Sequence, residues 1–304
     1  MMQKVFVAGA GGFIGGHLTK SLLEQGVEVI AADIKPLEEW FQSFPSADNQ
    51  TINLEDASAC LDLTEGCSTI YNLACNMGGM GFIENNRALC MLSVLINTHL
   101  LMAARHHSIK DFFYASSACV YPMGKQKDTE CSGLKEVDAY PADPEDGYGW
   151  EKLFSERMCR HFREDFGILC RVARFHNVFG PFGSFDGGRE KAPAALCRKA
   201  IEAKISGHRE IEIWGDGEQT RSFMYIDDCI VGINKLMGNN YFEPINIGRD
   251  DLVSINKLVD EIEVIAGVAL KRNYILDAPL GVRGRNSDNT EINRALNWQP
   301  STKL

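Results

Sequence analysis

The sequence feature that most constrains the fold is a glycine-rich turn between a short apolar strand, residues 4–8, and the start of a helix. Gly9, Gly12 and Gly15 follow each other at a spacing of three in this turn. The first glycine permits a tight turn, the second lets the backbone approach a pyrophosphate, and the third lets helix and strand pack closely. The arrangement predicts an α/β protein with a Rossmann-type, doubly wound parallel sheet whose first turn binds a dinucleotide.

A second apolar strand, residues 27–32, ends at Asp33. The dinucleotide fingerprint expects an acidic residue about 20 residues beyond the glycines. A carboxylate there accepts both ribose hydroxyls and repels a 2′-phosphate, so NAD is favoured as the cofactor. Lys35 lies two residues further on and leaves NADP open.

Strands and helices continue to alternate along the first part of the chain. Residues 1–180 are therefore predicted to form the NAD-binding Rossmann domain. Residues 181–304, where the alternation ends, are predicted to form mainly a smaller substrate-binding lobe, with the chain crossing between the two. We expect strands at 51–54, 69–74, 111–115 and 168–175, long helices at 84–107 and 148–166, and an irregular loop at 123–146.

Tyr148 and Lys152 are four residues apart, so on a helix they share one face. Ser117 leaves the end of a strand and can reach the same point. The lysine cation is expected to lower the phenol pKa from about 10 towards neutrality. A phenolate can then take a proton from a sugar or alcohol hydroxyl while hydride leaves the adjacent carbon. Such a pair is more often a solvated helix face, so this interpretation depends on the glycine turn.

Two further side chains need an interpretation. Cys119 lies two residues after Ser117 and can face the same substrate, although a buried cysteine is more often a small hydrophobe. A cysteine thiol beside cations is expected to have a lowered pKa and to form a reactive thiolate. His176 is interpreted as a structural residue.

Composition excludes several classes of protein. A formal net charge of −10 argues against nucleic-acid binding. No apolar run is expected to provide the ~20 residues of a membrane span, and the early first strand leaves no room for a signal peptide. The ten cysteines contain no C-x-x-C pair and indicate reduced thiols, which predicts a cytoplasmic protein. The seven histidines have no metal-ligand spacing, so no metal is expected.

The last third of this acidic chain gathers cations on its loops. Guanidinium groups suit diphosphates because they form paired hydrogen bonds with phosphate oxygens. Each cation alone is more typical of a solvated surface, but together they favour a nucleotide-linked substrate. The cations are Lys191, Lys199, Arg221, Arg283 and Arg285.

Together, the glycine turn, the Ser117, Tyr148 and Lys152 set, and the Trp-Gly-Asp-Gly stretch at 214–217 resemble the extended short-chain dehydrogenase/reductase family. Within it, some members invert C3 and C5 of GDP-mannose, and the similarity to these runs from Val5 to Pro300. The stretches that carry it are 76–83, 116–122, 174–177, 187–194 and 281–289.

The resemblance implies an NAD-dependent isomerase and a homodimer built from the two long helices. Its products would be GDP-L-galactose, and GDP-L-gulose when C5 alone inverts, formed through transient oxidation at C4. Oxidation makes C3 and C5 acidic, because both then lie next to a ketone. The resemblance assigns Cys119 and Lys191 as the base and acid pair, and Ser117, Tyr148 and Lys152 as the oxidation triad.

The resemblance also implies ligand contacts. Asn53 stands where the family usually has an aspartate near the adenine, which implies a weaker contact there. Members of the family also continue with helical sequence beyond the point that corresponds to Leu304. The implied substrate contacts are Gly78, Ser117, Ala118, Cys119, Asn177, Glu190, Lys191, Ala192, Lys199, Gln219, Thr220, Arg221 and Arg285. The implied cofactor contacts are Gly9, Gly12, Phe13, Ile14, Gly15, Asp33, Ile34, Asn53, Leu54, Leu73, Tyr148 and Lys152.

Other functions stay open from the sequence. A nucleotide-sugar 4,6-dehydratase needs an acidic residue near Ser117, where Ala118 and Cys119 stand. A 4-epimerase needs neither a thiol base nor a matching lysine. A non-catalytic NAD-sensing protein has no need of the Ser117, Tyr148 and Lys152 set.

Overall fold

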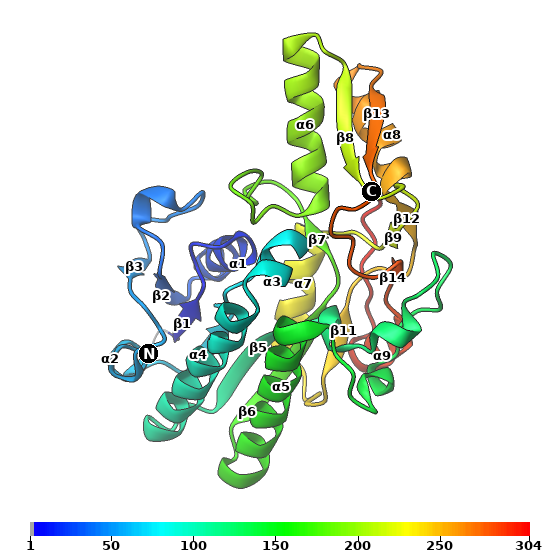
Figure 1. The fold of residues 1–304 in the computed structure, drawn as a ribbon. Helices are drawn as coiled ribbons and strands as arrows, with labels where there is room; N and C mark the ends of the chain where they lie inside the picture. The colour runs from blue at the N-terminus through cyan, green and yellow to red at the C-terminus, as the bar shows by residue number, and fades with distance from the viewer. Residues whose placement is uncertain (1–2) are drawn as a thin grey trace.

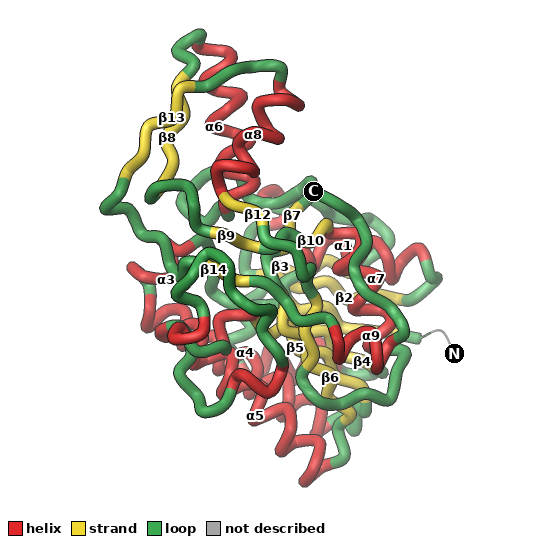
Figure 2. The backbone as a smooth tube through the Cα atoms, turned by 90° about the vertical axis from the view of Figure 1, so that its right-hand side faces the viewer, coloured by secondary structure: helices red, strands yellow, loops and turns green. Residues whose placement is uncertain are grey.

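A computed structural model of the chain describes residues 3–304. Within them, seven parallel strands form the central sheet, in the order β11-β6-β5-β4-β1-β2-β3. Figure 2 draws the strands in yellow, with helices on both sides of the sheet. The order runs outward in both directions from β1 and β4, and ligands of such sheets bind at the carboxyl edge beside this reversal. The doubly wound sheet is therefore confirmed. Its strands are β1 (Lys4–Ala8), β2 (Glu28–Asp33), β3 (Asp48–Thr51), β4 (Thr69–Asn72), β5 (Asp111–Ser117), β6 (Leu169–Phe175) and β11 (Ile245–Ile247).

Both faces of the sheet are covered, because successive side chains of a strand point to opposite sides. In β1, Val5 and Val7 belong to the core shared with α1 (Phe13–Glu24), α7 (Ile226–Met237) and α9 (Thr290–Leu296). Phe6 and Ala8 belong to the core on the other face. The helices there are α2 (Ala57–Thr64), α4 (Arg87–His106) and α5 (Asp146–Phe166).

The α4 helix differs from the expectation about membrane spans. By length and composition alone it is apolar enough to cross a membrane, and 44% of its apolar window is buried inside the protein. It packs against α2 and α5, so one side of it belongs to the core. The core helix of a soluble protein passes the same test, and this is weak evidence for a membrane span.

Two expected elements have different bounds. The third strand lies at Asp48–Thr51 rather than 51–54, because it is a polar edge strand whose position is set by pairing with β2. The helix expected at 84–107 is divided into α3 (Met80–Asn85) and α4. The break is at Asn86, whose side-chain amide donates to the carbonyl of Phe82. The loop at 123–146 is irregular as expected, apart from short 3₁₀ turns at Met123–Lys125 and Glu136–Ala139.

The second lobe stands above the sheet in Figure 1 and has a core of its own. It contains α6 (Ala192–Ser206), β8 (Glu210–Trp214), α8 (Ile255–Ala266) and β13 (Lys271–Ile275), with β8 and β13 paired in parallel. The chain also returns to the first domain, where β11 pairs with β6 and α7 packs on α1. Short strands connect the two bodies: β7 (Val178–Phe179), β9 (Thr220–Arg221), β10 (Met224–Tyr225), β12 (Val253–Ser254) and β14 (Gly284–Arg285).

Candidate active site

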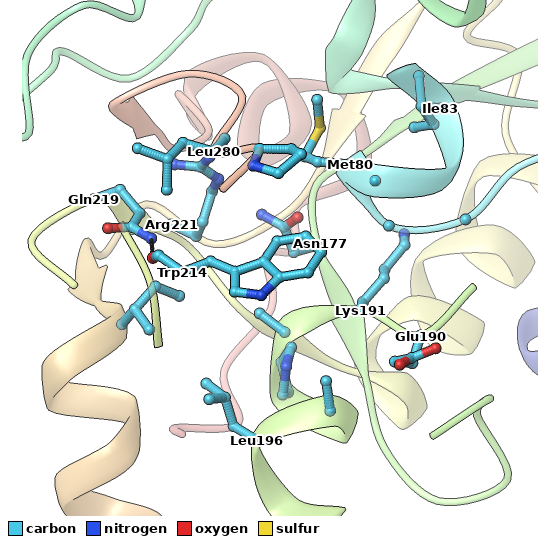
Figure 3. A pocket seen from close by; sticks show the side chains of 18 of the residues that line it. Met80, Ile83, Asn177, Glu190, Lys191, Leu196, Trp214, Gln219, Arg221 and Leu280 are labelled. Atoms are coloured by element: carbon cyan, nitrogen blue, oxygen red, sulfur yellow. Dashed lines mark hydrogen bonds between the residues drawn. The ribbon is translucent and has the colours of Figure 1, made fainter. Parts of the chain in front are cut away.

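A cavity of about 500 Å³ is lined by both parts of the chain. This volume lies in the usual range of roughly 300–1,000 Å³ for small-molecule sites. The first domain contributes the loop that ends at α3, the turn after β5, the start of α5 and the segment after β6. The second lobe contributes α6, Trp214 of β8 and the segments around Arg221 and Arg285 (Figure 3).

Most of the predicted substrate residues line this cavity. Thr220 is the exception: it is not in the lining, and its hydroxyl donates to the carbonyl of Thr129, so its expected substrate contact stays a prediction. Arg283 is also absent from the lining and pairs with Asp216 at 2.8 Å, so it does not join the expected cation cluster. The predicted residues that do line it are Gly78, Ser117, Ala118, Cys119, Asn177, Glu190, Lys191, Ala192, Lys199, Gln219, Arg221 and Arg285.

The glycine turn leaves no room for side chains. Gly9 has a φ of +82°, and a Cβ atom on it would lie 2.8 Å from the backbone nitrogen of Ala74. A Cβ on Gly15 would lie 2.0 Å from the carbonyl oxygen of Gly9. Gly12 immediately precedes α1, so the backbone there points its free N–H groups outward. These features fit a bound pyrophosphate.

The other predicted cofactor residues follow the carboxyl ends of neighbouring strands. Asp33 is the last residue of β2, is buried, and accepts the backbone N–H of Lys35 at 3.0 Å. The Lys35 ammonium is hydrogen-bonded to the carbonyl of Gly11 on the glycine turn. Phe13 and Ile14 begin α1, while Ile34, Asn53, Leu54 and Leu73 follow β2, β3 and β4.

Lys152 does not contact the Tyr148 hydroxyl as expected. Its ammonium donates to the hydroxyl of Tyr114 at 3.2 Å and lies 3.4 Å from Glu151. It is 5.5 Å from the ring centre of Tyr148. Burial opposes the charge of Lys152, but Cys75 and Glu151 outweigh it and the net pKa is raised. Lys152 is therefore held as a cation on a buried network.

The expectation that the protein's own residues lower the pKa of Tyr148 is wrong. Burial raises the pKa of Tyr148 well above its ordinary value, and Cys75 and Cys119 raise it further. Within residues 3–304, no cation is hydrogen-bonded to the phenol hydroxyl to offset this cost. Tyr148 lines the cavity beside Ser117, whose hydroxyl accepts the backbone N–H of Cys119 at 3.2 Å.

Cys119 lies against a buried ion pair that sequence reasoning missed. Its sulfur is 3.4 Å from Nη1 of Arg285, and Nη2 of the same guanidinium is 2.6 Å from Glu145. Burial raises the pKa of the Cys119 thiol, the Glu145 carboxylate raises it further, and Arg285 offsets this in part. The expected lowering of the thiol pKa is therefore wrong, because burial raises the pKa and the carboxylate offsets the cation.

Lys191 immediately precedes α6, and its side chain extends into the cavity (Figure 3). Burial lowers the pKa of Lys191, which brings its amine closer to the neutral form. Cys119 and Lys191 therefore line one cavity but come from different parts of the chain. Cys119 belongs to the turn after β5, and Lys191 to the second lobe.

The remaining polar wall lies around Trp214, a residue that sequence reasoning did not assign to the site. Lys199 lies 3.6 Å from the Glu212 carboxylate, and Arg221 donates to the carbonyl of Leu280 at 3.1 Å. Burial lowers the pKa of Arg221 to about 10. In the view of Figure 3, Arg221 and Lys191 lie on opposite sides of the Trp214 indole. Residues 3–304 contain no group of three or more His, Cys, Asp or Glu placed to hold a metal ion.

Comparison with known proteins agrees with this geometry. The description "NAD dependent epimerase/dehydratase family" matches residues 5–248. The chain belongs to this family. It is 47% identical over 302 residues to GDP-mannose 3,5-epimerase 1 of Oryza sativa subsp. japonica, a match covering 99% of this chain and 78% of the relative. The glycine turn and Tyr148 both lie within the residues that the family model matches.

Solved structures share the fold over nearly the whole chain. UDP-glucose 4-epimerase from Thermotoga maritima aligns with a TM-score of 0.89 at 23% identity, covering 99% of this chain and 95% of the other. UDP-glucuronic acid 4-epimerase from Bacillus cereus, in complex with UDP-glucuronic acid and NAD, aligns with a TM-score of 0.80 at 25% identity, with the same coverage. Both support an epimerase fold for this member of the family.

Proposed function

We propose that this chain is an NAD-dependent GDP-mannose 3,5-epimerase that forms GDP-L-galactose, and GDP-L-gulose when C5 alone inverts. The observation that carries the proposal is the presence of Cys119, Lys191 and Tyr148 in the lining of one cavity. The 47% identity to a GDP-mannose 3,5-epimerase over 99% of the chain supports the choice of substrate. A 4-epimerase or dehydratase would have no use for the thiol and amine pair.

NAD is the proposed cofactor. Gly9, Gly12 and Gly15 would hold its pyrophosphate, Asp33 its adenosine ribose and Lys152 its nicotinamide ribose. When bound, NAD would supply reversible hydride acceptance at C4 of the sugar. Lys35 is the cation that kept NADP possible from the sequence alone. Its ammonium donates to the carbonyl of Gly11, so it already has a partner on the glycine turn.

Proton transfer falls to the residues of the cavity. Because burial raises its pKa, Tyr148 must first lose its own proton; as a phenolate it takes the proton of the C4 hydroxyl, while Ser117 binds the C4 oxygen. Because C3 and C5 then lie next to a ketone, their hydrogens become acidic enough for side chains to remove. Inversion needs one group to remove a proton and another to deliver one to the opposite face, and Cys119 and Lys191 are assigned these tasks. Each such group typically contributes ~10²–10⁴-fold to the rate.

The test is incubation with GDP-mannose and NAD in heavy water, followed by NMR of the sugar. We expect deuterium at C3 and C5 and none at C4, because the hydride at C4 is conserved. A 4-keto-6-deoxy product or inversion at C4 alone would identify a dehydratase or a 4-epimerase instead. NAD binding with no exchange in any sugar nucleotide would identify a sensor.

A homodimer is part of the proposal. Large apolar side chains about half exposed lie on α4 and α5, which pack together along their length. A second copy that brings the same two helices would cover them. These residues are Met91, Leu92, Met102, Trp150 and Phe154.

All ten cysteines are free thiols, which supports a cytoplasmic location.

A further inference from the structure

The guanidinium of Arg285 contacts three side chains at the wall of the cavity. Its Nη2 is 2.6 Å from Glu145, its Nη1 is 3.4 Å from the sulfur of Cys119, and its Nε donates to Gln126. Arg285 and Glu145 are both buried, with 6% and 5% of their surfaces exposed. A buried carboxylate and guanidinium in such contact behave as a nearly neutral pair.

We propose that Glu145 is a positioning residue that acts through Arg285 to keep Cys119 in its thiol form. The part that Cys119 then plays in proton exchange rests on the proposed function. Without the carboxylate, the guanidinium beside the sulfur would favour the thiolate. With it, the positive charge that the sulfur experiences is largely cancelled.

The backbone fixes this geometry. The N–H of Glu145 donates to the carbonyl of Cys119 at 2.9 Å, and the carbonyl of Glu145 accepts the N–H of Gly149 at 2.9 Å in the first turn of α5. A Cβ on Gly149 would lie 2.3 Å from the Cys119 carbonyl oxygen, so the helix start and the Cys119 turn are in close contact. The backbone of Glu145 is therefore held against the turn that carries the sulfur, and the hydrogen bond to Arg285 holds its carboxylate.

The other groups around Cys119 make the carboxylate more important. Uncharged neighbours are Ser117 of β5, Tyr148 of α5 and Cys75 after β4. The charged neighbours other than Glu145 are cationic: Lys191 before α6, Arg221 of β9 and Arg285 of β14. Glu145 is the one carboxylate hydrogen-bonded to Arg285 among residues 3–304. Removing its charge would leave the cations without an opposing charge near the sulfur.

The consequence is a cavity-facing sulfur that carries its proton at rest. Because the thiolate is the form that reacts with oxidants, the resting thiol is protected from oxidation. When Cys119 acts as a base, loss of this proton becomes a separate, titratable step of turnover. Neither consequence requires Glu145 to touch the substrate.

The test measures the alkylation of Cys119 by iodoacetamide across pH, in the NAD-loaded protein and without any sugar nucleotide. Peptide mass spectrometry separates Cys119 from the other nine cysteines. In the unmodified protein we expect the alkylation rate, plotted against pH, to have its inflection above the ordinary thiol pKa of about 8.5. An inflection at or below that value would overturn the proposal without any variant.

In Glu145→Gln the inflection should fall by at least one pH unit. The alkylation rate at pH 7 should rise about threefold per unit, because a tenfold gain in thiolate is reduced by its lower nucleophilicity. Glu145→Asp keeps the charge and should restore the original inflection. Glu156→Gln is the matched control, because it removes the carboxylate of another buried arginine pair that does not line the cavity.

An unchanged inflection in a folded, NAD-binding Glu145→Gln protein would refute the role of Glu145. The outcome is independent of the proposed substrate, because no sugar nucleotide is present. If the heavy-water experiment fails while the titration behaves as described, the proposed function falls and the Glu145–Arg285–Cys119 arrangement stands.

Discussion

Acid should destabilise this protein through one buried side chain, His176. The imidazole is 1% exposed, and its Nε2 lies 3.1 Å from the side-chain oxygen of Asn246. Its Nδ1 is buried without a hydrogen-bond partner. Burial lowers the pKa of His176 to about 3. The residue is therefore neutral in the folded protein, in line with the structural role expected from the sequence.

The sign and size of the effect follow from proton binding. An unfolded histidine titrates near 6.5, so between about pH 6.5 and 3 the unfolded chain binds a proton that the folded chain does not. Stability therefore falls as the pH falls through this window, and the contribution is fully present above it. At pH 5 the solution is about 1.5 units below the unfolded pKa, which at 1.36 kcal/mol per unit costs about 2 kcal/mol.

The assay compares the free energy of unfolding at pH 7 and pH 5, from denaturant titrations, for the unmodified protein and His176→Gln. The variant lacks the titrating group, so its loss between the two pH values should be smaller by about 2 kcal/mol. His208→Gln is the control, because it makes the same substitution at an exposed histidine. Equal losses in His176→Gln and the unmodified protein would refute the argument.

Three further predictions concern the proposed activity. Gly15→Ala should weaken NAD binding about 5–150-fold in a direct titration, because overpacking costs ~1–3 kcal/mol and the new Cβ would lie 2.0 Å from a carbonyl oxygen. Gly124→Ala, which has open space around it, should bind NAD normally. Cys119→Ala should lower the rate of inversion by ~10²–10⁴-fold yet keep NAD binding. Cys197→Ala, at an exposed cysteine, should keep both. A normal rate of inversion in Cys119→Ala would remove this residue from the mechanism. Phe154→Lys should give a folded monomer by light scattering, since it places a charge on the proposed dimer face, and an unchanged mass would argue against that face.

Local patterns in the sequence predicted the parts of the fold that depend on local physics. The glycine spacing after β1 and the apolar strands of the sheet carry their own periodicity, and the structure has them where they were expected. The edge strand β3 has a polar sequence and takes its register from β2, so no pattern could locate it. Thr220 lies outside the lining for a reason available in advance: it precedes Arg221 in β9, and neighbours along a strand point to opposite sides.

The missed residues of the site depend on contacts between distant parts of the chain. Glu145 lies in an irregular loop, and its importance comes from Arg285, 140 positions away. Glu151 stands beside Lys152 in the sequence, but its role depends on Tyr114, 37 positions away. A single carboxylate has no periodicity to reveal such a partner. The pKa expectations for Cys119 and Tyr148 failed for the same reason, because burial and Glu145 were not visible from the sequence.

The return of the chain to complete the sheet with β11 has a consequence for any attempt to divide the protein. A fragment ending near residue 180 would lack β11 and leave the edge of β6 without its partner, exposing unsatisfied backbone groups that invite aggregation. It would also lose α7, so the apolar side of α1 would face water. The first domain therefore cannot be separated from the rest of the chain, because its folding depends on β11 and α7, which follow the glycine turn by more than 200 residues.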